Sequence, residues 1–272
     1  ASYGAEAHGD SDTFDTLEPQ PKDVVHISGN TLMDHTATGV DGFLLKAGTD
    51  PAARDYTLVI NPTNTLRLVN DHMLEDLVLA RPVWSCNRQE AMTLAERLGA
   101  PIDDSKVTIG GGLDDFMHQL CDGLGATLRA PLVVRVGARG AWIREPGGET
   151  IHIEGYPTKA VHTRSAGGCH TGVMCAMLAK GHSLAESVKI ANAAASIAIQ
   201  HSLNGVPQCP DYDEAIALIG ADRKDDAVVL IRQIQQKDGL TETLRRRLSE
   251  MMIVLGADPD LNKGPGPQPM TP

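Results

Sequence analysis

The chain has 272 residues and a formal net charge of −11 at pH 7. A chain of this length can bury one sizeable core, and its acidic surface attracts neither nucleic acid nor anionic membranes, so neither is expected as a partner. No apolar run approaches the roughly 18 residues that span a bilayer, and the polar N-terminus carries no signal-peptide pattern. We therefore expect a cytoplasmic protein.

Apolar runs of strand length alternate with helical patterns along the first 220 residues. Short strands are predicted at 24–27, 57–60 and 83–85, and helices at 36–46 and 87–98. A helix at 113–124 then leads to strands at 132–136 and 141–144, and an alanine-rich helix follows at 184–201. Strands separated by helices predict a parallel sheet covered on both faces, in one α/β domain at 1–220.

The C-terminal residues follow a different pattern. An apolar stripe recurs at helical spacing, formed by Leu240, Leu244, Leu248, Met251 and Leu255. Together with a helical stretch at 227–236, it predicts an appended helical hairpin over residues 221–258. The closing sequence GPGPQPMTP cannot continue a helix, so a flexible tail is expected at 259–272.

The cysteines and histidines give no sign of a metal site. The five cysteines are odd in number and lack the C-x-x-C spacing of zinc ligands. No histidine pair shows metal-ligand spacing on a helix face together with a third ligand. The sequence therefore predicts no metal site made directly by a cluster of side chains.

Residues 161–178, VHTRSAGGCHTGVMCAML, have the layout of a strand end, a turn of small residues and a helix, expected at about 169–180. Small residues at Ala166, Gly167 and Gly168 allow backbone N–H groups to approach an anion, and the helix dipole adds about half a positive charge. This predicts an anion hole. A tight connection in which the small residues serve packing alone is the alternative.

The same segment resembles the signature D-T-x-G-A-G-D-x-F-x-G of the ribokinase-like (PfkB) carbohydrate and nucleoside kinases. Thr163, Ala166, Gly167 and Gly172 match that pattern. The resemblance implies that the anion hole is the family's phosphate cradle.

The general base of the family is missing from this signature. Gly168 stands where the family carries the Asp that removes a proton from the substrate hydroxyl. His170 and His162 are the candidate substitutes, because both lie near the turn. Neither occupies the position of the lost carboxylate.

Three further segments resemble family elements, in the family's order. Gly137 and Gly140, in VVRVGARGAWI, resemble the nucleotide-side T-L-G-x-x-G turn, and Asn87 and Glu90 resemble the N-x-x-E element that helps to organise magnesium and phosphate. Asn192 stands in the late helix whose Asn lies near the adenine in the family. The resemblance therefore implies ATP and Mg²⁺ as cofactors.

The resemblance covers roughly residues 23–218. It implies a three-layer ribokinase-like α/β fold, with a mostly parallel central sheet flanked by helices. The family's first strand, its lid and most of its sugar contacts precede the point where this chain begins, so the lid is expected to be absent. Either the chain is a fragment of a longer product, or it is a natural truncation, or a homo-oligomer or a second chain supplies that N-terminal portion.

Three functions remain open from the sequence. The first is ATP-dependent phosphoryl transfer to a sugar or nucleoside hydroxyl, and the second is a degenerate pseudokinase that binds a nucleotide or metabolite. The third is a structural α/β subunit without a ligand. Loss of a positioned base lowers the rate about 10² to 10⁴-fold. The missing Asp therefore leaves the activity undecided, but it does not change the family that the chain resembles.

Overall fold

The computed structural model describes most of the first 216 residues. The described residues are 14, 16–46, 49–102, 112–156, 158–161, 163, 165–200, 202–203, 206–216, 219, 242, 245–246 and 249. The chain divides into two compact units, Ala1–Ala215 and Ile216–Pro272, and the fold below is that of the first unit. The predicted hairpin at 221–258, apart from the isolated helical positions 242, 245–246 and 249, and the predicted tail at 259–272 lie outside the described residues.

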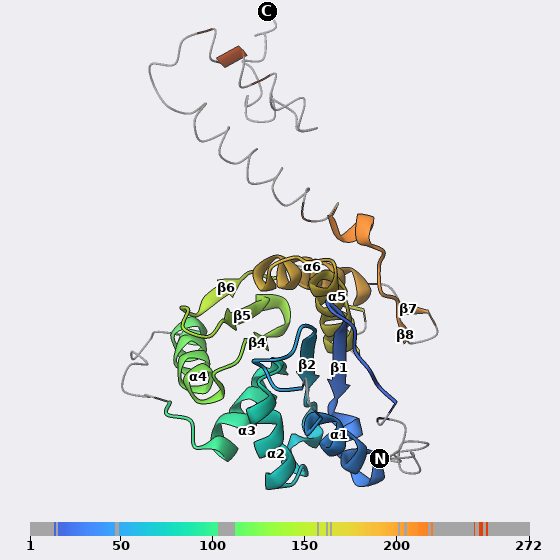
Figure 1. Cartoon of the computed structure of the whole chain (residues 1–272). Helices are drawn as coiled ribbons and strands as arrows, with labels where there is room; N and C mark the ends of the chain where they lie inside the picture. The colour runs from blue at the N-terminus through green and yellow to red at the C-terminus, as the bar shows by residue number, and fades with distance from the viewer. Residues whose placement is uncertain are drawn as a thin grey trace, which may run out of the picture. The chain divides into compact units, whose positions relative to one another are not determined.

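A six-stranded sheet forms the centre of this unit, with its strands side by side in chain order (Figure 1). The first four strands are parallel: β1 (Val24–Ser28), β2 (Thr57–Asn61), β3 (Val83–Asn87) and β4 (Leu132–Arg135). The last two, β5 (Ala141–Arg144) and β6 (Ile151–Ile153), are antiparallel to their neighbours. A separate two-stranded hairpin joins β7 (Ser202–Leu203) and β8 (Val206–Pro207).

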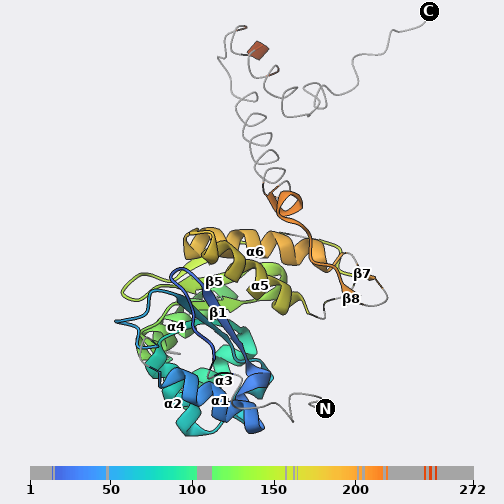
Figure 2. The same ribbon diagram turned by 45° about the vertical axis from the view of Figure 1, so that its right-hand side comes forward.

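Helices cover both faces of the sheet (Figures 1 and 2). One layer contains α1 (Asp34–Leu44), α2 (Asp71–Ala80), α3 (Arg88–Leu98) and α4 (Gly112–Leu128), and the other contains α5 (Ala166–Ala179) and α6 (Leu184–Ala198). Short 3₁₀ helices follow three strands, at η3 (Gly29–Leu32), η4 (Asn64–Arg67) and η6 (Gly137–Arg139). The predicted three-layer arrangement is confirmed.

Side chains alternate between two hydrophobic cores along each strand. Leu58 and Ile60 of β2 pack in the core beneath α1–α4, whereas Val59 between them packs in the core beneath α5 and α6. This is the period-two alternation of a strand buried on both faces. The sheet is therefore held from both sides, and its strand ends are left to form a site.

The structure differs from the sequence prediction at several elements. Helix α2 is not predicted, although Asn70 caps it by accepting a hydrogen bond from the Met73 amide at 2.8 Å. Strand β6 is also missed, because it has only three residues and the first two are exposed. Helix α5 begins at Ala166 instead of 169, so the predicted anion-hole residues form its first turn. Within the described residues, no helix is long and apolar enough to cross a membrane.

Candidate functional site

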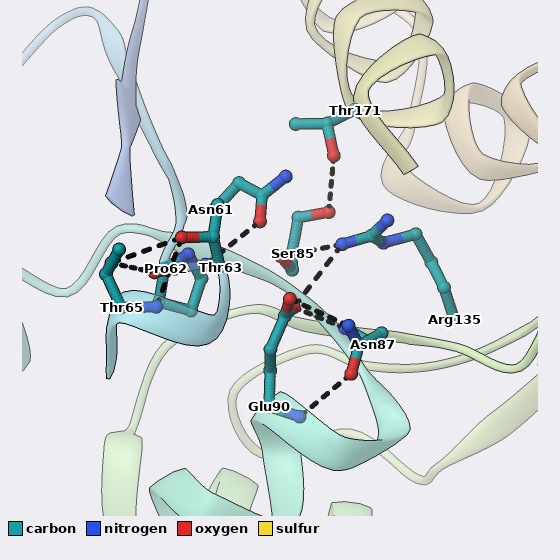
Figure 3. A network of polar contacts seen from close by, with 9 residues as sticks. All are labelled: Asn61, Pro62, Thr63, Thr65, Ser85, Asn87, Glu90, Arg135 and Thr171. Atoms are coloured by element: carbon teal, nitrogen blue, oxygen red, sulfur yellow. Dashed lines mark hydrogen bonds and ion pairs between the residues drawn. The ribbon is translucent and has the colours of Figure 1, made fainter. Parts of the chain in front are cut away.

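Polar side chains gather where the parallel strands end (Figure 3). Asn61, Asn87 and Arg135 are the last residues of β2, β3 and β4, and parallel pairing brings them to the same edge of the sheet. In open α/β sheets, ligands bind outside the carboxyl ends of the strands. This edge is therefore the candidate site.

The loop after β2 is held against the end of β1 by a close backbone approach. A Cβ on Gly29 would lie only 1.8 Å from the Pro62 carbonyl oxygen, so this position admits only glycine without a shift of the backbone. The Thr65 hydroxyl lies within hydrogen-bond distance of both the Gly29 and Pro62 carbonyls, at 2.8 and 2.9 Å. Thr63 takes a left-handed conformation at φ 53°, and its amide donates to Asn61 Oδ1 at 3.3 Å. These contacts fix one wall of the site.

Asn87 and Glu90 form a capping box at the start of α3. Asn87 Oδ1 accepts from the Glu90 amide at 2.9 Å, while Glu90 Oε2 accepts from the Asn87 amide at 2.7 Å. Asn87 Nδ2 also donates to Glu90 Oε1 at 2.7 Å. The two residues of the N-x-x-E element are thus brought together, and both carboxylate oxygens accept hydrogen bonds. They line a pocket of about 310 Å³ with Thr63.

Arg135 connects this capping box to α5. Its Nη2 lies 3.6 Å from Glu90 Oε2 and donates to the Ser85 carbonyl at 3.3 Å. On the α5 side, a Cβ on Gly167 would lie 2.1 Å from Nη1, so the guanidinium covers the start of that helix. Burial lowers the pKa of Arg135, and the negative charge of Glu90 counteracts this shift.

The opening turn of α5 presents backbone donors beside this guanidinium. Ser165, the N-cap, is left-handed at φ 63°, and its side chain makes no cap hydrogen bond within the described residues. The Ala166 amide donates to the Thr163 carbonyl at 3.3 Å, and helix geometry leaves the amides of Gly167 and Gly168 without an intrahelical acceptor. Arg135 Nε is buried and donates no hydrogen bond to any residue that the structure describes. This donor set suits an anion such as a phosphate group.

Helix α5 is fixed to the sheet one turn further along. The hydroxyls of Thr171 and Ser85 share a hydrogen bond of 2.9 Å, and both residues are fully buried. Gly168 is exposed, and a Cβ added there would meet no described atom within 4 Å. The turn is therefore anchored from below and open at Gly168.

His170 is buried and contacts α6 through Asn192. It is 3% exposed, and its Nε2 lies 3.0 Å from Asn192 Oδ1. Burial, followed by the charge of Arg135, lowers the pKa of His170 to about 3, so the ring is neutral near pH 7. The structure gives no support to His170 as a substitute base, and His162 lies outside the described residues.

Asn192 is engaged in the interior. Its Nδ2 donates to the carbonyls of Ile153 and Glu154 at 3.1 and 3.0 Å, while its Oδ1 contacts His170. These bonds join α6, α5 and the end of β6. Both polar atoms of the Asn192 side chain thus already have partners within the protein. Its predicted place beside adenine stays a prediction.

The glycine turn between β4 and β5 has a structural explanation at one of its two positions. Gly140 has φ 82°, and a Cβ there would lie 2.1 Å from the Ile153 carbonyl oxygen. Gly137 has φ 54° but open space around it. Gly140 is therefore required by packing against the segment after β6, while Gly137 has open space on its Cβ side.

Sequence reasoning missed several residues of this edge. Arg135 registers in the sequence only as a departure from the family's Thr, and Ser85 and Thr171 give no local signal because their pairing is long-range. The sequence also gives no sign that Cys169 and Cys209 are close, yet their Sγ atoms lie 3.1 Å apart. The sequence signal that could have identified this edge is the polar residue at the end of each buried parallel strand.

Comparison with known sequences identifies relatives of this chain. A model of the pfkB family of carbohydrate kinases matches residues 15–209. The chain is 33% identical over 133 residues to an uncharacterized sugar kinase of Escherichia coli, YegV, covering 49% of this chain and 37% of that protein.

Solved structures share the fold. Ribokinase from Thermotoga maritima has a TM-score of 0.60 at 16% identity, over 80% of this chain and 64% of that chain. Aminoimidazole riboside kinase from Salmonella enterica, complexed with aminoimidazole riboside and an ATP analog, has a TM-score of 0.55 at 15% identity, over 76% of this chain and 66% of that chain. The chain thus spans 37% of the curated relative and roughly two thirds of these structures. Since the family model matches well over half of it, the chain belongs to the pfkB family of carbohydrate kinases.

Proposed function

We propose that this chain binds ATP at the carboxyl edge of the sheet and transfers its terminal phosphoryl group to a hydroxyl of a sugar or nucleoside. The observation that carries the proposal is the meeting of the Arg135 guanidinium with the first turn of α5, at Gly167. A buried cation and a helix N-terminus both favour negative charge. The amides of Gly167 and Gly168 would hold the transferring phosphoryl group.

The nucleotide would extend from this anion hole towards the β4–β5 turn. Gly137, with its left-handed backbone and open surroundings, supports close approach of the nucleotide there. Asn192 and Gly140 would not contact the adenine; they would support its binding site by fixing the packing of α6 and of the β4–β5 turn.

Mg²⁺ would be held near Asn87 and Glu90. Both Glu90 oxygens already accept hydrogen bonds from Asn87, which favours contact through the water shell that Mg²⁺ retains in phosphate sites. When bound, the ion would neutralise charge on the phosphates. The protein's own part is to hold the Glu90 carboxylate at the strand edge through the capping box.

Transfer by this chain would be slow, because Gly168 offers no carboxylate. A positioned base contributes about 10² to 10⁴ in rate. Phosphoryl transfer nevertheless passes through a loose transition state, in which positioning and charge neutralisation supply most of the acceleration. The anion hole and Arg135 can therefore support residual activity without the base.

A second candidate is a protein that binds the nucleotide without transferring phosphate. The absence of a side chain at Gly168 favours it, as does the neutral, buried state of His170. Binding and transfer must therefore be measured separately.

The test combines a thermal-shift titration with MgATP and single-turnover assays on a panel of sugars and nucleosides. Ligand at 100 times its dissociation constant adds about 2.7 kcal/mol of stability, so binding would raise the melting temperature measurably. The assays are run over a range of protein concentrations, so that a contribution from self-association is detected.

Restoring the lost carboxylate separates the two candidates. Gly168→Asp should raise the single-turnover rate by about 10² or more if the chain is a slow kinase. Gly172→Asp is the matched control, since it adds the same charge to α5 at an equally open and exposed position. Binding of MgATP without transfer in any variant would favour the second candidate, and no binding at all would refute both.

A further inference from the structure

Three side chains with metal-ligating atoms meet between α1 and α2, and none of them belongs to a kinase motif. His72 and Asp76 lie one helical turn apart on α2, so they share a face, and Asp41 reaches them from α1. His72 Nε2 lies 3.6 Å from Asp76 Oδ2 and 3.8 Å from Asp41 Oδ2. One ligand atom from each residue lies within 4.8 Å of the other two.

The two carboxylates are largely buried and incompletely satisfied. The Asp76 side chain is 11% exposed and that of Asp41 27%. Asp76 Oδ2 and Asp41 Oδ1 are shielded from solvent and accept no hydrogen bond from the residues that the structure describes. Two neighbouring carboxylates in this state are unfavourable unless a cation or a shared proton lies between them.

His72 does not resolve this arrangement by itself. Its side chain is 71% exposed, and its distances to the two carboxylates exceed hydrogen-bond length. Among the residues that the structure describes, the ion pairs of Asp41 and Asp76 are both with this one histidine. The cluster thus holds two acidic ligands and one imidazole that converge without a hydrogen bond between the imidazole and either carboxylate.

The spacing fits a tetrahedral metal ion. Zinc–ligand distances of about 2.0 to 2.2 Å place the ligand atoms of a tetrahedral site about 3.3 Å apart. The two separations from His72 Nε2, 3.6 and 3.8 Å, close to this value with shifts of a few tenths of an ångström, and the ligand oxygens of Asp41 and Asp76 lie within 4.8 Å of each other. An imidazole among the ligands favours zinc and related transition metals over calcium or magnesium.

We propose that Asp41, His72 and Asp76 bind a divalent transition metal of the zinc class. A pocket of about 360 Å³, lined by Asp41 and His72 together with Thr38 and Asn70, opens onto the cluster and gives the ion a route of entry. Three protein ligands leave a fourth position for water. The bound ion ties α1 to α2 and stabilises the layer that covers β1 and β2.

The three proposed ligands are not among the residues that the proposed kinase function uses. The third ligand comes from a different helix, which explains why spacing along the sequence predicts no metal cluster.

The chain carries its own negative control. His118 and Asp114 on α4 repeat the one-turn spacing, with His118 Nε2 3.8 Å from Asp114 Oδ2. The structure brings no third ligand to them within the described residues. Both α2 and α4 thus carry a histidine and a carboxylate one turn apart, but only on α2 does a third ligand, Asp41, approach the pair among the described residues.

The experiment titrates the full chain, first freed of metal by a chelator, with Co²⁺ as a spectroscopic probe and Zn²⁺ as competitor. We expect the visible absorption of tetrahedral Co²⁺, saturating at one ion per chain and abolished by Zn²⁺. Asp41→Asn and His72→Ala should each weaken Co²⁺ binding more than tenfold, whereas His118→Ala should leave it unchanged. The near-isosteric Asn guards against loss of binding through misfolding, which circular dichroism checks.

Two results would overturn the proposal. One is a parent protein that gives no tetrahedral spectrum, together with an Asp41→Asn variant that melts at a higher temperature than the metal-free parent; this would assign the carboxylates to a shared proton. The other is a spectrum that survives both Asp41→Asn and His72→Ala.

Discussion

Replacing Glu90 by Ala tests the polar network at the strand edge. Glu90 is 9% exposed and accepts hydrogen bonds from the Asn87 amide and Asn87 Nδ2, and it lies 3.6 Å from the Arg135 guanidinium. Removing one partner of a buried ion pair leaves the other charge uncompensated, which costs about 3 to 5 kcal/mol. Asn87 still caps α3 through its own side-chain oxygen, so the loss of the Glu90 half of the capping box adds little.

The assay is urea unfolding followed by circular dichroism, with Glu96→Ala on the exposed face of α3 as the matched control. Glu90→Ala should lower the free energy of unfolding by about 3 to 5 kcal/mol, and Glu96→Ala by less than about 0.5 kcal/mol. Arg135→Met in the Glu90→Ala background should recover much of the loss, because no buried charge then remains. This gives a coupling energy of about 2 kcal/mol or more.

Two outcomes would refute this reasoning. A Glu90→Ala protein within about 1 kcal/mol of the parent would mean that the carboxylate does not compensate a buried charge. Additive effects of the two substitutions would mean that Arg135 and Glu90 do not interact.

Two further predictions follow from close contacts and burial. Gly29→Ala should destabilise the fold by about 1 to 3 kcal/mol in urea unfolding, because the new Cβ would lie 1.8 Å from the Pro62 carbonyl oxygen. The control, Gly42→Ala, lies in open space on α1 and should be neutral or stabilising by up to about 1 kcal/mol. Equal effects of the two substitutions would contradict the contact. The pKa of His170 is lowered to about 3 in the folded state, whereas in the unfolded chain it is about 6.5. As the pH is lowered below about 6.5, the unfolded chain therefore binds one more proton, and the free energy of unfolding decreases by about 1.4 kcal/mol per pH unit. Urea unfolding from pH 7.5 to pH 5 should show a weaker pH dependence in His170→Gln than in the parent, and identical slopes would show that the ring is already accessible to protons.

The fold is largely predictable from the sequence because its strands are continuous apolar runs. Strands β2 and β3 are buried on both faces, so they stand out against the helices between them. Helix α2 is missed although Met73, Leu74, Leu77 and Ala80 form a buried stripe. Its ten residues lie between two predicted strands, where only tertiary packing distinguishes a helix from a loop.

The site is predicted less completely, because a motif does not reveal its partners. The N-x-x-E element is interpreted from the sequence as a ligand motif, and in the structure the same two residues also form the capping box of α3. Its link to α5 passes through Arg135, which lies 45 positions after Glu90 in sequence order. Contacts of this kind depend on strand register, which local patterns do not specify.

In the proposed function, the first turn of α5 and Arg135 together hold a nucleotide phosphate. Calorimetric titration with MgATP tests it most directly, using Arg135→Met and, as control, Arg129→Met at the opposite end of β4. We expect saturable one-site binding that Arg135→Met weakens at least tenfold and Arg129→Met leaves unchanged. Absence of binding in the parent, or equal affinity in the parent and Arg135→Met, would contradict it.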